Sequence, residues 1–152
     1  HRKPRALVAY HYADGEDCER CDQTLQPLAN KLGLPILQTP DSSATEDGTQ
    51  RAAVIIRKAL TGQNAAGGSP VVLVTWNHHH IANITAALGV AASLIPSWPG
   101  SDFDSVFKLE FHGTQLAGFS VDSENFNPAA EQPSAQKLDV GEALLESRVS
   151  DW

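Results

Sequence analysis

The chain has 152 residues, of which 41% are hydrophobic and 19% are charged, and this composition is typical of a globular domain with its own core. The formal net charge of −7 argues against nucleic acid as a partner, because a phosphate backbone favours a basic surface. The longest apolar runs, over residues 71–74 and 90–95, are far too short to cross a bilayer, so we expect no membrane partner either.

Apolar periodicity divides the chain into alternating strands and helices. Continuous apolar runs predict buried strands, and apolar residues that recur every three or four positions predict helices. Gly33 and Gly89 are the C-terminal stop signals, and Pro27 is expected in the first turn of its helix, where a missing N–H is harmless. In chain order the predicted elements are a strand over residues 6–10, a helix over 25–32, a strand over 34–37, a helix over 49–60, a strand over 71–75, a helix over 80–88, and two strands over 103–111 and 116–121.

This order of elements predicts the fold class. Residues 1–127 are expected to form an α/β domain, a three-layer α/β/α arrangement with a mostly parallel sheet that ends in an antiparallel hairpin. The strand over residues 71–75 is expected to be buried on both faces of the sheet, because its apolar run is unbroken. The strand over 103–111 alternates apolar and polar residues, starting from Phe103, as a half-buried strand does. Residues 128–152 follow as a C-terminal extension.

Two segments carry the candidate chemistry. Arg20 stands at a helix start after the first predicted strand, and His78 follows the strand that ends at Thr75. Ligands of parallel sheets bind beyond the carboxyl ends of the strands, so we expect both side chains at one edge. Helix N-termini and the Arg guanidinium favour anions, and a His beside them can donate to a phosphoryl group. The sequence therefore predicts weak binding of phosphate or a phosphomonoester.

The same segments carry two family motifs. Residues 20–34 read Arg-x-x-Gln-Thr and then Pro-Leu-Ala-x-x-Leu-Gly-Leu, and residues 71–78 are a strand that leads to a His. Both segments resemble motifs of the histidine phosphatase (phosphoglycerate mutase-like) superfamily. Trp-Asn-His at 76–78 and Trp-Pro-Gly-Ser-Asp-Phe-Asp at 98–104 are most similar to a branch of secreted fungal proteins.

The resemblance implies a phosphohistidine mechanism. One His attacks phosphorus, an acidic residue protonates the leaving oxygen, and water then cleaves the intermediate. By position, the resemblance assigns phosphate binding to Arg20 and His78, and it also gives His78 a catalytic role in stabilising the transferring group. The candidate acids are Asp41, Glu46 and Asp47.

The chain departs from the family at the nucleophile. The family carries it in an Arg-His-Gly motif on the first strand, and no Arg-His-Gly occurs here. Residues 6–10 match the family's next strand, so the first strand and helix are expected to be cleaved, carried on another chain or lost. The sheet would then lack a central strand unless another strand pairs there. The chain is expected to be a phosphomonoester hydrolase if that segment is supplied, or a non-catalytic secreted protein that keeps the fold for binding or assembly.

Cys18 and Cys21 support a competing interpretation. A Cys-x-x-Cys pair near a helix start is also the thioredoxin arrangement, so a thioredoxin-like redox domain is an alternative function. A local disulfide between the two Cys is compatible with either fold. The sequon Asn83-Ile84-Thr85 predicts glycosylation at Asn83, and it favours secretion.

The histidines do not indicate a metal site. Three consecutive His at 78–80 point in different directions on a helix, so we expect neither a metal ion nor another cofactor. His11 and His112 show no partner pattern and are expected to be incidental.

Overall fold

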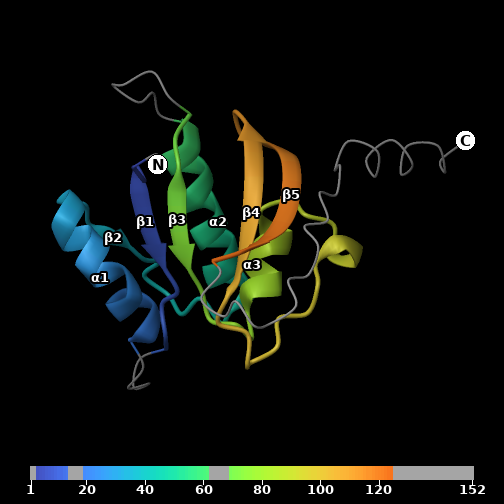
Figure 1. Ribbon diagram of the computed structural model, residues 1–152, viewed down its shortest axis with the longest axis horizontal. Helices are drawn as coiled ribbons and strands as arrows, with labels where there is room; N and C mark the ends of the chain where they lie inside the picture. Colours follow the sequence, from blue (N-terminus) through green and yellow to red (C-terminus); the bar gives the residue numbers. More distant parts are fainter. Residues whose placement is uncertain (1–2, 14–18, 62–68, 125–152) are drawn as a thin grey trace, which may run out of the picture.

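The computed structural model describes residues 3–13, 19–61 and 69–124 (Figure 1). The predicted succession of strands and helices is confirmed over these residues, and the predicted extension over 128–152 lies outside them. The elements are β1 (Ala6–Ala9), α1 (Arg20–Leu32), β2 (Ile36–Leu37), α2 (Glu46–Thr61), β3 (Val72–Thr75), α3 (Ile81–Ala87), a 3-10 turn (Ala92–Leu94), β4 (Ser105–His112) and β5 (Gln115–Ser123).

Three parallel strands form the central sheet in the order β2-β1-β3, and β4 pairs with β5 in a separate antiparallel hairpin. β1 is the middle strand, since Leu7 is in register with Ile36 on one side and with Leu73 on the other. The mixed α/β class with a mostly parallel sheet is therefore confirmed. Because β1 and β3 pair directly, no open strand position separates them.

β3 is an edge strand of this sheet, and none of its residues is fully buried, so the expectation that residues 71–75 are buried on both faces is wrong. Leu73 is 40% exposed, whereas the residues of β1 are at most 7% exposed. Both strands are short apolar runs, and their composition does not reveal which of them has a neighbour on each side. Strand order, which the sequence does not show, decides their burial.

Helices cover both faces of the sheet (Figure 1). Leu7 of β1 packs with Leu25 of α1 on one face. The next residue, Val8, packs with Ile56 of α2 and Ile84 of α3 on the other face, because successive strand side chains point to opposite sides. This is the expected three-layer arrangement. No helix among the described residues is long and apolar enough to cross a membrane.

α1 begins at Arg20, as expected for the segment that carries the anion site, although the apolar periodicity alone indicated a helix only over residues 25–32. Pro27 therefore lies inside the helix, and the expectation that it occupies the first turn is wrong. Its missing N–H leaves the Gln23 carbonyl without the usual helical donor. Both residues are exposed, so water can take that place. Gly33 ends the helix in the left-handed conformation with φ 67°, as predicted.

The hairpin of β4 and β5 forms a small core of its own. Lys108 and Glu110 are exposed while the apolar residues between and beside them are half-buried, which confirms the predicted alternation. Phe107 packs edge to face on Phe119, with the ring centroids 5.3 Å apart. Phe103 lies before β4 and is 84% exposed, so the expectation that it belongs to the inward face is wrong.

Candidate anion site at the carboxyl edge of the sheet

The start of α1 and the end of β3 lie side by side at the carboxyl edge of the sheet. The Thr75 hydroxyl of β3 donates to the Cys21 carbonyl of α1, with Oγ1 and O 2.8 Å apart. Arg20, the first residue of α1, is exposed, and His78 is half-buried three residues after Thr75. The two segments predicted to carry the anion site are therefore neighbours, although this hydrogen bond does not itself join the Arg20 and His78 side chains.

His78 lies in the loop between β3 and α3, where the three consecutive His have different surroundings. The rings of His78 and His79 are in contact, with centroids 3.9 Å apart. His78 Nε2 lies beside Gly100, so closely that a Cβ on Gly100 would be 3.3 Å from it. His80 instead stacks on Tyr10, with centroids 5.6 Å apart. Among the described residues, no group of three or more His, Cys, Asp and Glu side chains could hold a metal ion.

Tyr10 joins the end of β1 to this loop. Its ring is almost fully buried and packs edge to face on Trp76, with centroids 5.2 Å apart. It also packs edge to face on Tyr12, with centroids 4.8 Å apart. The Tyr12 hydroxyl in turn lies 3.4 Å from Cys21 Sγ, next to Arg20. This aromatic cluster therefore connects β1 to both candidate segments.

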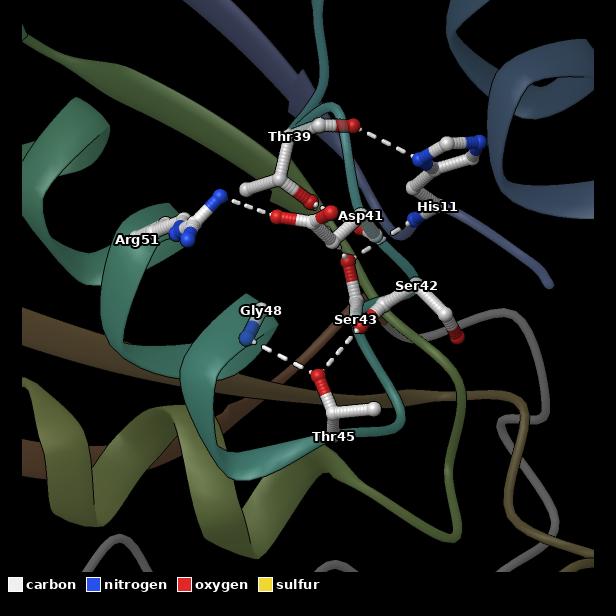
Figure 2. Close-up of polar contacts among 8 residues, drawn as sticks. All are labelled: His11, Thr39, Asp41, Ser42, Ser43, Thr45, Gly48 and Arg51. Atoms are coloured by element: carbon white, nitrogen blue, oxygen red, sulfur yellow. Dashed lines mark hydrogen bonds and ion pairs between the residues drawn. The ribbon is translucent and has the colours of Figure 1, made fainter.

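His11, between those two tyrosines, has hydrogen-bond partners that the sequence did not indicate. Its ring Nδ1 lies 2.6 Å from the Thr39 carbonyl oxygen. Its backbone N–H donates to Ser43 Oγ over 3.0 Å (Figure 2). In return, the Ser43 N–H donates to the His11 carbonyl over 2.8 Å. No local sequence signal indicates these partners, because they come from a loop far along the chain.

The loop between β2 and α2, which contacts His11, is tied together by its own hydrogen bonds. Two of its polar side chains, Thr39 and Ser43, are buried, and so is Thr49 of α2. The Thr49 hydroxyl donates to the Ser43 carbonyl over 2.9 Å. Thr45 Oγ1 accepts the N–H of Gly48 over 3.0 Å and so caps the N-terminus of α2 (Figure 2). The Thr39 carbonyl that binds His11 is thus part of a loop with several internal hydrogen bonds.

The three candidate acids lie in or next to this loop. Asp41 is exposed and forms an ion pair with Arg51 of α2, toward which Figure 2 shows its carboxylate turned. Glu46 and Asp47 are exposed in the first turn of α2, where negative charge is favourable. Helix and ion-pair stability account for these positions, and the described contacts do not select one of the three as the acid.

Asp22 is a charged group at this edge that the sequence did not single out. It lies on α1, and Gln38 Nε2 donates to its Oδ2 over 2.7 Å. Partial burial raises the pKa of Asp22, against the lowering effects of the Gln38 hydrogen bond and the nearby His11. Asp22 is therefore close enough to His11 for their charges to interact.

The remaining predicted sites stay predictions. Cys21 is buried in α1, but Cys18 lies outside the described residues, so neither the disulfide nor the redox interpretation is tested. Asn83 is exposed on α3, as a glycosylated residue must be. Thr85, the third residue of the sequon, is buried and donates its hydroxyl to the Ile81 carbonyl over 2.7 Å.

Comparison with known proteins identifies no family for this chain. It matches no family model, no curated protein and no solved structure. The resemblance to histidine phosphatases therefore depends on the motifs themselves, and the site has to be interpreted from its own geometry.

Proposed function

We propose that this chain is a secreted, histidine phosphatase-like protein that binds phosphate or phosphomonoesters weakly at the carboxyl edge of its sheet. The main observation in support of the proposal is the hydrogen bond from the Thr75 hydroxyl to the Cys21 carbonyl. It holds the strand end that leads to His78 against the helix start that carries Arg20. Hydrolysis requires a nucleophile segment from outside this sequence, and without it the chain is a non-catalytic binding or assembly protein.

The typical free energies of the expected interactions support weak binding of the anion. A helix N-terminus stabilises a nearby anion by about 0.3–1 kcal/mol. A charged hydrogen bond from Arg contributes about 1.5–3 kcal/mol. Desolvation and ordering of the side chains reduce this sum, so we expect a dissociation constant on the order of millimolar.

Thermal unfolding in the presence of phosphate tests the proposal. Phosphate, sulfate or vanadate at about ten times a millimolar dissociation constant should raise Tm measurably, because each anion binds the folded state only. Arg20→Ala should abolish the rise. Lys31→Ala is the matched control, since Lys31 is an exposed cation in the last turn of the same helix. A wild-type Tm that is indifferent to these anions, or an unchanged response in Arg20→Ala, would contradict the proposal.

An assay of p-nitrophenyl phosphate hydrolysis distinguishes a catalytic protein from a non-catalytic binding or assembly protein. Because the chain carries no Arg-His-Gly motif, it should hydrolyse this ester no faster than buffer does. An anion response without turnover supports a binding or assembly role. Turnover that His78→Ala abolishes would show that this chain has a nucleophile of its own.

A further inference from the structure

We infer that the ligand of the proposed anion site lies between His78 Nε2 and the backbone of Gly100, in the space that a side chain at position 100 would fill. The inference rests on the role of His78 in the proposed function and names the ring nitrogen that faces the ligand. It makes the turn over residues 99–102 the second wall of the site, a segment that had no role in the anion site predicted from the sequence.

The space beside Gly100 is defined by what a side chain there would meet. A Cβ on Gly100 would lie 3.3 Å from His78 Nε2 and 3.8 Å from His78 Cδ2. Apart from the chain neighbours of Gly100, no other described residue would come within 4 Å of that Cβ. Gly100 is exposed, whereas His78 is half-buried. The space is therefore closed on one side by the imidazole edge that carries Nε2 and can be reached from solvent.

Backbone conformation does not require a glycine at position 100. The φ angle of Gly100 lies outside the left-handed region in which glycine is favoured. Gly33 and Gly113 differ in this respect, since they end α1 and turn the hairpin of β4 and β5 with φ of 67° and 64°. The missing side chain of Gly100 therefore matters for the room that it leaves next to His78.

Hydrogen bonds from Asn77 hold the His78 side of the space. The Asn77 carbonyl accepts the His80 N–H over 2.9 Å, and Asn77 Oδ1 accepts the His79 N–H over 3.0 Å. The His79 ring also lies against the His78 ring, with centroids 3.9 Å apart. The imidazole of His78 is thus carried by a turn that is already formed without a ligand.

The Gly100 side is held in the same way by its own turn. The Asp102 N–H donates to the Pro99 carbonyl over 2.9 Å, and Trp98 Nε1 donates to the Asp102 carbonyl over 3.0 Å. The Asp102 carboxylate accepts the N–H of Ser105 over 2.9 Å, so this acid is bound within its own loop. Because both walls are formed in advance, little conformational entropy is lost when a ligand binds between them.

The groups that border the space suit an oxyanion. Among the described residues, neither ring nitrogen of His78 has a hydrogen-bond partner. Nε2 can therefore carry the proton of the neutral ring and donate it to a phosphate oxygen. The Gly100 N–H also has no partner within the described part of the chain. A phosphate oxygen accepts hydrogen bonds from donors of both kinds, so phosphate or a phosphomonoester matches the chemistry of this space.

A single methyl group placed in the space tests the inference. Gly100→Ala puts a Cβ where the ligand would lie, so the rise in Tm with phosphate should be several-fold smaller than in wild type. Tm without phosphate should change little, because the position is exposed and its φ is not left-handed. Ser101→Ala, in the exposed neighbour, is the matched control, since it adds no atom to the space and should keep the wild-type response. Equal responses in the two variants would overturn the inference.

Nitrogen-detected NMR of the imidazoles provides a second readout that does not depend on stability. Inorganic phosphate should shift the Nε2 resonance of wild-type His78, and this shift should be lost in Gly100→Ala. A shift of the His78 Nδ1 resonance alone would overturn the inference, because Nδ1 is not the nitrogen beside Gly100. A Tm response that needs His78 but survives in Gly100→Ala would leave the proposed function standing, whereas a wild-type protein without any response would overturn both.

Discussion

His11 and Ser43 are joined by two reciprocal hydrogen bonds, one from the His11 N–H to Ser43 Oγ over 3.0 Å and one from the Ser43 N–H to the His11 carbonyl over 2.8 Å. Ser43 is completely buried, so no water replaces these bonds. The pair ties the end of the central strand to the loop before α2.

Ser43→Ala should destabilise the fold. The substitution removes the acceptor of the half-buried His11 N–H and leaves that donor without its partner, which costs about 1–3 kcal/mol. Urea unfolding measures the loss. The control is Ser42→Ala, in a half-buried residue whose hydroxyl accepts only the Ala44 N–H over 3.3 Å. Its effect should be about 0.5 kcal/mol or less, and equal losses in both variants would contradict the assigned role of Ser43.

Gly48→Ala should be more damaging than an ordinary Gly→Ala change in a helix. A Cβ at this position would lie 2.0 Å from the Ser42 carbonyl oxygen, so the loop before α2 would have to move. Overpacking of this kind costs about 1–3 kcal/mol and should appear as a lower midpoint of unfolding. Gly118→Ala on β5 is the control, because its nearest contact would be an ordinary 3.5 Å. A Gly48→Ala protein as stable as this control would show that the loop can adjust freely.

Thr75→Val should weaken the junction between β3 and α1. It removes the hydroxyl that donates to the Cys21 carbonyl while it keeps the shape of the side chain. We expect a loss of about 0.5–1.5 kcal/mol in unfolding free energy and a smaller phosphate response. Thr24→Val is the matched control, since the Thr24 hydroxyl also donates to a carbonyl, that of Arg20 within α1, over 2.7 Å. A phosphate response reduced equally by both variants would argue against a special role for the junction.

Asp102 should contribute stability that depends on pH. Partial burial acts to raise its pKa, but hydrogen bonds from Ser105 and from the Asp104 N–H outweigh it and hold the pKa of Asp102 below its usual value. A lowered pKa means that the stabilisation is complete above the unfolded value of about 4 and is lost as pH falls through the folded value. The advantage of wild type over Asp102→Asn should therefore shrink in unfolding experiments below about pH 4.

Asp22 should show the opposite pH dependence of stability in the same unfolding experiments, because its pKa is raised and not lowered. Burial raises the pKa of Asp22, so its carboxylate disfavours the folded state once it ionises. Relative to wild type, Asp22→Asn should therefore become more stable as pH rises from about 3 to about 7. Identical pH trends for the Asp22 and Asp102 variants would contradict the two assigned environments.

The local pattern of the sequence was sufficient to predict the elements, because it depends on residues a few positions apart. The stop at Gly33 and the alternation through Lys108 and Glu110 are such signals, and both are confirmed. The apolar periodicity alone indicated only residues 25–32 of α1, and for that reason Pro27 was wrongly expected in the first turn. An exposed Pro is tolerated inside a helix whose apolar side packs on a sheet, and that packing is not visible in the sequence.

The sequence by itself determined the α/β class, the order of the elements and the segments that reach the carboxyl edge with Arg20 and His78. Tertiary structure alone decided that β1 and not β3 is the central strand, and that His11 is held by Thr39 and Ser43. Apolar periodicity and turn signals act between near neighbours in the chain, so they can be read locally. Strand order and hydrogen bonds between distant residues depend on how the whole sheet packs, because many arrangements of the same elements satisfy the local pattern equally well.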